Sequence, residues 1–195
     1  MIETLARYMT FQIEHAELPL VNLGVGANPP NLCGPGVFHV DLDRWNYPNF
    51  IQADIHDLPF RDDSFASVVC GDVLEHLKDP PRALREMWRV APKIVLTTFM
   101  EWRLPGPGQY IEDARRIFSP WEGGYEPYRE AGTFLAVYPE SKLPHITHIN
   151  QWRDLDELFE MFRDAGLRTT VWEADSPGVH EGHSLLNYMF VLVRR

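Results

Sequence analysis

Cysteine is scarce in this sequence, where Cys33 and Cys70 are the only two among 195 residues. They stand singly, without the spacing of a zinc site or of a disulfide framework, so we expect a reduced, cytoplasmic protein. Long apolar runs are also missing, because no stretch approaches the roughly 18 residues that span a membrane. The first residues lack a signal-peptide pattern. These absences argue against a membrane-spanning or secreted protein.

Positive charge is in short supply. Eighteen Lys and Arg residues stand against 28 Asp and Glu residues, which gives a formal net charge of −10. No run of Lys and Arg offers a surface that would neutralise phosphates, so we do not expect a nucleic-acid partner. With 45% hydrophobic residues, the chain can bury one substantial core, and we expect residues 1–195 to form a single domain.

Short apolar runs alternate with amphipathic segments along the chain. Helices are predicted over 2–13, from Asp79–Pro80 onward with an apolar stripe through Trp88, and over 152–165 before Gly166. Strands are predicted over P-L-V-N-L-G and over 37–43, 49–54, 67–71, 93–99, 168–174 and 185–193. Such alternation is typical of an open α/β sheet with mostly parallel strands.

The connections between the first three predicted strands are short. A parallel crossover needs about a dozen residues, and R-W-N-Y-P between the second and third strands is too short for a regular helix. We therefore expect shortened or missing helices here. Residues 100–150 are the opposite case, a long stretch rich in Pro, Gly and aromatics, with a predicted helix near 109–118 and a strand near 132–138. Such insertions often form lids over binding sites, and we expect this one to hold the acceptor pocket.

Polar residues follow the predicted strands. Ligands of open α/β sheets bind beyond the carboxyl ends of the strands, and this rule brings together Asn22, Gly24, Gly26, Asp41, Asp54 and Asp72. The two glycines allow close approach of a ligand to the backbone. Asp41 can accept hydrogen bonds from ribose hydroxyls, and Asp54 with the Ile55 N–H can bind an adenine edge. A dinucleotide is a poorer fit, because Pro29 occupies the third glycine position of that motif.

The order of motifs resembles the class I S-adenosylmethionine-dependent methyltransferases of the broad type 11 group. V-N-L-G-V-G matches the first motif of that family and H-V-D-L-D its second strand. A-D-I-H-D-L-P-F-R-D-D-S-F followed by V-V-C-G-D-V-L-E-H-L is the most specific part. The resemblance covers about residues 19–99. It implies a seven-stranded sheet with an antiparallel last strand, and S-adenosylmethionine bound at the glycine turn.

Three departures from the family pattern stand out. The acid usual at position 22 is replaced by Asn22, which removes one expected contact near the methionine part of the cofactor. Ala66 stands where Asp is common. The turn before the fifth strand, A-P-K, lacks the usual Pro-Gly-Gly.

Methyl transfer depends mainly on positioning, so no obligatory catalytic motif marks the site. Asp72 is expected at the methyl-donor end, with His76 on the same face if the segment is helical. His145 and His148 precede the last helix and are further candidates for a base, although surface or packing roles fit them as well. The four histidines of H-I-T-H and H-E-G-H are potential metal ligands, but the sequence fixes no geometry for them, and no metal is predicted.

The sequence thus predicts a methyltransferase that uses S-adenosyl-L-methionine, releases S-adenosyl-L-homocysteine and modifies a small-molecule or sugar-type acceptor. No membrane partner is expected, and nothing indicates an oligomeric state. A catalytically silent binding or scaffold protein on the same fold is the main alternative, supported by Asn22 and the short crossovers. Aminopropyl transfer with the decarboxylated cofactor is a further one.

Overall fold

Seven strands form one open sheet. The computed structural model describes residues 10–26, 32–77, 79–101, 126–128, 133–137, 144–146, 155–180 and 183–195. The sheet order is β3-β2-β1-β4-β5-β10-β9. Its strands are β1 (Leu20–Leu23), β2 (Val37–Asp41), β3 (Phe50–Gln52), β4 (Ser67–Gly71), β5 (Lys93–Glu101), β9 (Leu167–His180) and β10 (His183–Arg194). Strands β1 to β5 pair in parallel, whereas β10 is antiparallel to both β5 and β9. The predicted open, mostly parallel sheet with an antiparallel last strand is confirmed.

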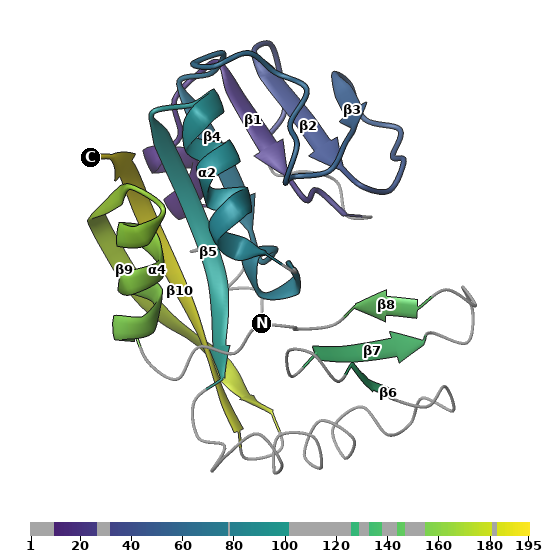
Figure 1. Cartoon of the computed structure of the whole chain (residues 1–195), viewed down its shortest axis with the longest axis vertical. Helices are drawn as coiled ribbons and strands as arrows, with labels where there is room; N and C mark the ends of the chain where they lie inside the picture. The colour runs from purple at the N-terminus through teal and green to yellow at the C-terminus, as the bar shows by residue number, and fades with distance from the viewer. Residues whose placement is uncertain are drawn as a thin grey trace.

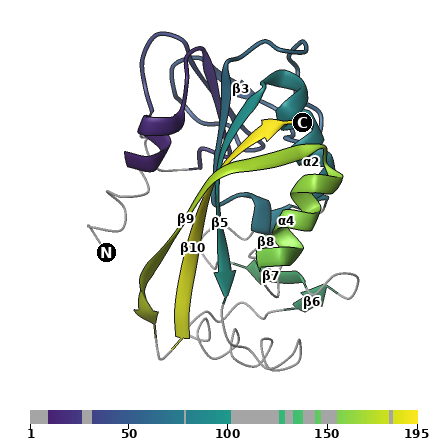
Figure 2. The same cartoon turned by 90° about the vertical axis from the view of Figure 1, so that its left-hand side faces the viewer.

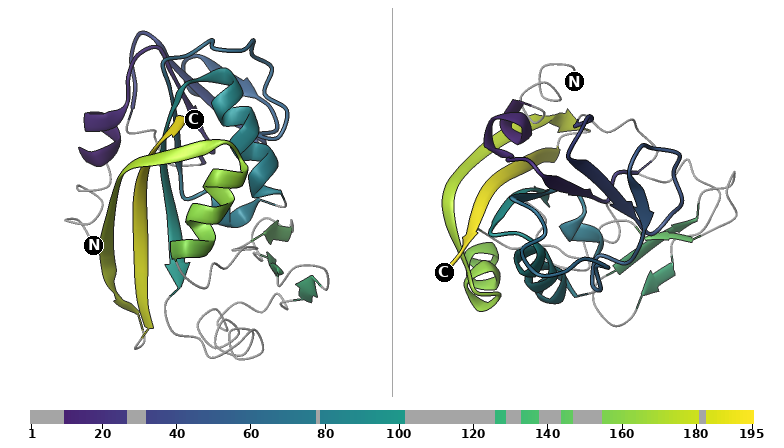
Figure 3. Two further views of the ribbon diagram at one scale, coloured as in Figure 1. Left: turned by 60° about the vertical axis from the view of Figure 1, so that its left-hand side comes forward. Right: turned by 90° about the horizontal axis from the view of Figure 1, so that it is seen from above.

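Helices cover the two faces of the sheet unequally. Helices α2 (Pro80–Val90) and α4 (Leu155–Asp164) lie together on one face, and the helix at residues 10–15 lies on the other (Figures 2 and 3). The larger apolar cluster packs under α2 and α4, and a smaller cluster that includes Phe11 packs under the helix at residues 10–15. The described part of the first predicted helix is therefore helical, and its remainder lies outside the described residues.

Local signals account for the ends of both large helices. The Asp79 side chain accepts a hydrogen bond from the backbone N–H of Arg82, which caps α2 as predicted. Ala83, Leu84 and Met87 are fully buried on its inner face. Gly166 follows α4 with a φ of +82°, a conformation that terminates helices and that glycine adopts without strain.

No helix crosses from β2 to β3, because none of the residues 42–49 is helical. Aromatic side chains cover this part of the sheet instead. The ring of Tyr47 packs edge-on against His39, with centroids 5.9 Å apart, and against Phe50 at 6.5 Å. The prediction of a missing crossover helix is confirmed between β2 and β3.

An open cleft of about 640 Å³ lies along this loop and β3. It is lined by Arg44, Trp45, Asn46, Tyr47, Phe50 and Gln52, and it contains none of the predicted site residues.

A second, three-stranded sheet belongs to the long segment after β5. Strands β6 (Glu126–Tyr128), β7 (Thr133–Val137) and β8 (Pro144–Ile146) pair antiparallel in that order. Figure 1 shows this sheet on the side of the molecule where the parallel strands of the large sheet end. The predicted strand near 132–138 is confirmed, and the predicted helix near 109–118 lies outside the described residues. Within the described part of the chain, no helix has the length and apolar character needed to cross a membrane.

Helix α2 holds the loop that follows Asp54. Arg89 donates to the carbonyl oxygens of Leu58 at 3.0 Å and Phe60 at 2.8 Å, and it pairs with Glu86 at 2.7 Å. The second oxygen of Glu86 accepts from the backbone N–H of Leu58 at 2.9 Å. Hydrogen bonds to Glu86 and to Asp62 raise the pKa of the Arg89 guanidinium, and the bonds from Arg89 and from the Leu58 N–H lower the pKa of the Glu86 carboxyl. The family-like stretch D-L-P-F is thus fixed to the helix through Arg89 and its partner Glu86.

We expect Arg89→Met to lower the free energy of unfolding by about 2–4 kcal/mol, because the carbonyl groups and Glu86 lose their donors while remaining partly buried. Arg163→Met is the matched control, since Arg163 meets Glu160 at 3.5 Å and both side chains are more than half exposed. That control should change stability by less than about 0.5 kcal/mol. Urea denaturation of the two variants makes the comparison, and equal losses would contradict the assignment.

Candidate functional site

The glycine turn after β1 places its two glycines in different surroundings. Gly24 and Gly26 have φ angles of +68° and +59°, which disfavour residues with a side chain. A Cβ atom on Gly24 would lie 2.2 Å from Cγ2 of Val73, whereas a Cβ on Gly26 would meet no atom of the described residues within 4 Å. Gly24 therefore permits packing between the first turn and the segment after β4. Gly26 leaves open space beside the backbone, which is where a ligand can approach.

Asp41 ends β2 beside this turn. Its Oδ2 accepts a hydrogen bond from the Gly26 N–H, and its Oδ1 accepts one from the Asp43 N–H, both at 2.9 Å. Tyr47 donates its hydroxyl to the Gly26 carbonyl at 3.1 Å. Each carboxylate oxygen has one backbone donor and retains a second lone pair, so Asp41 can still accept from a pair of ligand hydroxyls.

Asp54 follows β3, and one of its two carboxylate oxygens is hydrogen-bonded. Its Oδ1 accepts from the backbone N–H of His56 at 2.9 Å and contacts the ring Nδ1 of His56 at 2.7 Å. Burial raises the pKa of the Asp54 carboxyl, but the hydrogen bonds from the backbone and ring of His56, together with the nearby charge of Arg82, outweigh it and hold the pKa below its ordinary value. Oδ2 makes no hydrogen bond within the described part of the chain, and neither does the adjacent N–H of Ile55.

Two acids lie beyond β4, each bound by a threonine of β5. Asp72, with a φ of +53°, accepts from the Thr97 hydroxyl at 2.9 Å, and Glu75 accepts from the Thr98 hydroxyl at 2.9 Å. Burial raises the pKa of Asp72 to about 6, and the Thr97 hydrogen bond opposes this rise. Burial, Glu75 and Asp72 together raise the pKa of the Cys70 thiol, so that thiol stays protonated. This end of the site is therefore acidic and poorly hydrated.

The expected relation between Asp72 and His76 is wrong. The segment forms only the 3-10 turn η1 (Leu74–His76), which begins after Asp72, and the left-handed backbone at Asp72 prevents a helix from starting earlier. The two residues therefore do not share a helix face.

Asn22 lies partly buried in β1, between His39 of β2 and Val69 of β4. His145 lies in β8, but its side chain is outside the described residues, as are His148 and Asn28. Among the described residues, no group of three or more His, Cys, Asp or Glu side chains is arranged to hold a metal ion.

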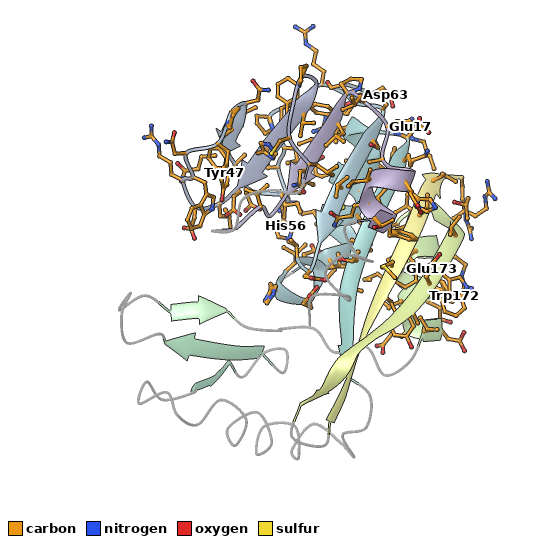
Figure 4. All side chains as sticks on the ribbon, turned by 180° about the vertical axis from the view of Figure 1, so that it is seen from behind. Glu17, Tyr47, His56, Asp63, Trp172 and Glu173 are labelled. Atoms are coloured by element: carbon orange, nitrogen blue, oxygen red, sulfur yellow. The ribbon has the colours of Figure 1, made fainter. Side chains whose placement is uncertain are left out.

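Three residues of this region were not predicted from the sequence: His56, Tyr47 and Thr97. Figure 4 places Tyr47 and His56 at the end of the sheet opposite to Asp63 and Glu17, on the side where the parallel strands finish. Asp54 itself is a local signal for the backbone contact, because Asp side chains commonly accept from the N–H two residues later in an Asx turn, which here is that of His56. Nothing local identifies Thr97, which meets Asp72 only across neighbouring strands.

Comparison with known proteins agrees with this arrangement. Residues 33–93 match the family model described as a methyltransferase domain. The chain has the class I methyltransferase fold. One similar structure is magnesium protoporphyrin IX methyltransferase from Synechocystis with bound SAH. The match covers 99% of this chain and 83% of the chain of that methyltransferase, with 14% identity and a TM-score of 0.56. A second is a [4+2]-cyclase called SpnF. The match covers 98% of this chain and 80% of the SpnF chain, with 12% identity and a TM-score of 0.60.

Sequence comparison adds curated relatives. A demethylmenaquinone methyltransferase of Streptomyces griseus is 26% identical over 149 residues, which are 74% of this chain. The chain spans 60% of the length of that relative. The class I methyltransferase fold and the family match thus agree with the resemblance seen in the sequence.

Proposed function

We propose that the protein is an S-adenosylmethionine-dependent methyltransferase acting on a small-molecule acceptor. The observation that carries this proposal is the pairing of an open acceptor, Oδ2 of Asp54, with an open donor, the Ile55 N–H. That pair is complementary to the 6-amino group and N1 of adenine. Asp41 lies beside the glycine turn, where its free lone pairs suit the two hydroxyls of a ribose.

The remaining parts of the site support the same assignment. Asp72 and Glu75 place carboxyl groups at the end where the sulfonium centre would lie, and a cation is favoured there over an anion. Among the described residues, none would contact a Cβ atom on Gly26, which is consistent with room for a ligand beside this turn. With Asp41 and Asp54 at the proposed adenosine end and Asp72 at the proposed donor end, the cofactor would be held in one orientation, as in-line methyl transfer requires.

The acceptor is proposed to bind under residues 100–150, where His145 and His148 are the candidate bases. The demethylmenaquinone methyltransferase relative favours a hydroxylated ring, such as a hydroquinone, over a sugar as the first acceptor to test. A silent binding protein on the same fold is the alternative, supported by the neutral Asn22 and by the absence of a helix between β2 and β3.

Calorimetric titration with S-adenosylmethionine and S-adenosylhomocysteine tests the cofactor half of the proposal. We expect both ligands to bind, and Asp41→Asn and Asp54→Asn each to weaken binding about tenfold or more by removing a charged acceptor. Glu160→Gln, on the exposed side of α4, serves as the control and should bind normally. If the wild-type protein binds neither ligand at high micromolar concentration, the proposal fails.

A second assay separates an enzyme from a binding protein. Release of S-adenosylhomocysteine is measured with a panel of hydroquinones, phenols and sugars. Turnover with any acceptor supports methyl transfer, whereas cofactor binding without turnover across the panel favours the silent alternative.

A further inference from the structure

We infer that His56 is a positioning residue that aims the Asp54 carboxylate at the base of the ligand and thereby sets the preference for a 6-aminopurine. This inference rests on the proposed function, because it concerns the adenine end of the same site. It adds to that function a residue that contacts no ligand itself and acts through Asp54.

The geometry separates the two carboxylate oxygens. Oδ1 of Asp54 is held from two directions, by the backbone N–H of His56 at 2.9 Å and by ring Nδ1 at 2.7 Å. The His56 side chain is 16% exposed, so its ring is fixed by packing, whereas the Asp54 side chain is 51% exposed. Two donors on Oδ1 restrict rotation of the carboxylate, and they leave Oδ2 and the Ile55 N–H without a hydrogen-bond partner in the described part of the chain.

The ring must carry its proton on Nδ1 to donate to Asp54. The other nitrogen, Nε2, is buried and has no partner among the described residues, so a proton there would lack an acceptor. The neutral tautomer with Nδ1–H therefore fits the surroundings, an assignment made from the hydrogen-bond geometry. His56 then acts as a fixed donor at the back of the carboxylate.

An ordered acceptor and donor pair discriminates between purines. Adenine presents a donor at its 6-amino group and an acceptor at N1, which match Oδ2 and the Ile55 N–H. Hypoxanthine presents the reverse, an acceptor at position 6 and a donor at N1, so both contacts become repulsive. Sites that bind a polar group in this way can reject a mismatched analogue strongly. A carboxylate free to rotate would lose part of this selectivity while still attracting the ligand.

The experiment compares S-adenosylhomocysteine with S-inosylhomocysteine, in which the 6-amino group is replaced by oxygen. Binding is measured by calorimetry for the wild type, His56→Phe and His56→Asn. We expect the wild type to prefer the adenine ligand strongly, and His56→Phe to reduce that preference about tenfold. His56→Asn should keep most of it, because its amide nitrogen can donate from a position close to Nδ1.

A matched control comes from the other face of the sheet. Nδ1 of His15 bonds to the Phe11 carbonyl at 2.9 Å on the helix at residues 10–15, so His15→Phe loses a similar bond away from the site. It should leave the ratio of the two affinities unchanged. Melting temperatures of all variants report whether each one folds.

The outcomes are distinct. If the wild type binds S-adenosylhomocysteine and His56→Phe keeps the full preference, the inference is overturned while the proposed function stands. A His56→Phe variant that weakens both ligands equally would show a merely structural role and would also overturn it. If the wild type binds neither ligand, the proposed function fails and the inference falls with it.

Discussion

Gly24→Ala is expected to unfold much of the site, whereas Gly26→Ala is expected to leave the fold intact. A Cβ on residue 24 would stand 2.2 Å from Cγ2 of Val73, a distance that real Cβ contacts do not show. Valine is short and held in the turn after β4, so the backbone of one segment has to move. We expect a loss of about 2–4 kcal/mol from this overlap together with the left-handed backbone.

Gly26→Ala introduces the backbone strain of a positive φ without the steric overlap that Gly24→Ala creates. Its φ of +59° costs an alanine about 1 kcal/mol, but no atom of the residues that the structure describes lies within 4 Å of the added Cβ. Stability should therefore fall only slightly, while S-adenosylhomocysteine binding falls strongly because the methyl group occupies the space of the ligand. Thermal denaturation and calorimetry on both variants check this contrast.

A double variant tests the cause at position 24. Val73→Ala removes the side chain that the new Cβ would meet, so Gly24→Ala/Val73→Ala should be more stable than the sum of the single losses implies. Strictly additive losses would show that backbone strain alone explains the effect.

Asp72→Asn is the second change with a large expected effect, and it should act in opposite directions on stability and on ligand affinity. Burial raises the pKa of Asp72 to about 6 in the folded protein, so the folded chain holds this proton more tightly than the unfolded chain does. The resulting stabilisation is complete below the ordinary pKa of an aspartate and disappears as the pH rises through about 6. At neutral pH the ionised, buried carboxylate is a cost, and the neutral amide of the variant removes that cost.

We therefore expect Asp72→Asn to raise the free energy of unfolding at neutral pH by about 1–3 kcal/mol. An amide can still accept from Thr97, and Asn tolerates the left-handed backbone at this position. Denaturant unfolding at several pH values makes the measurement. Equal stabilities at acidic pH, together with a gain above pH 6, are the expected pattern.

The same variant should lose the preference for a charged donor. S-adenosylmethionine carries a sulfonium charge that S-adenosylhomocysteine lacks, while the rest of the two ligands titrates alike. In the wild type, the ratio of their affinities should rise in favour of S-adenosylmethionine by about tenfold as the pH increases through the pKa of Asp72. Asp72→Asn should flatten this rise, which separates the titration of Asp72 from that of other groups. A rise that persists in the variant would contradict the placement of Asp72 at the donor end.

Much of the fold was predictable from local pattern. Neighbouring residues predict the start of α2 at Asp79–Pro80, its buried apolar stripe and the apolar strand β4. The structure confirms all three. Strand β3 is shorter than predicted, at Phe50–Gln52, because it lies at the sheet edge and pairs only with β2. Strand β5 runs past its predicted end, since β10 continues to pair with it as far as Glu101.

The site was predictable at the level of single strand ends but not of contacts between them. The bond from Thr97 to Asp72 depends on the register of β4 with β5, and the close approach of Gly24 to Val73 depends on β1 lying beside β4. Both are consequences of sheet order, which no short stretch of residues encodes. The family resemblance predicted the cofactor turn, yet the reason why Gly24 must be a glycine emerged only from packing.

The stretch 42–49 must carry the chain from the end of β2 back to the start of β3. Phe50 pairs with His39, so the chain has to return only two residues along β2, about 7 Å, whereas eight extended residues reach about 27 Å. The extra length lets the loop reach the glycine turn, where the Tyr47 hydroxyl donates to the Gly26 carbonyl at 3.1 Å. Ring contacts with His39 and Phe50 hold Tyr47 on the sheet at the same time. A connection that forms no crossover helix thus ties the edge of the sheet to the turn beside Asp41.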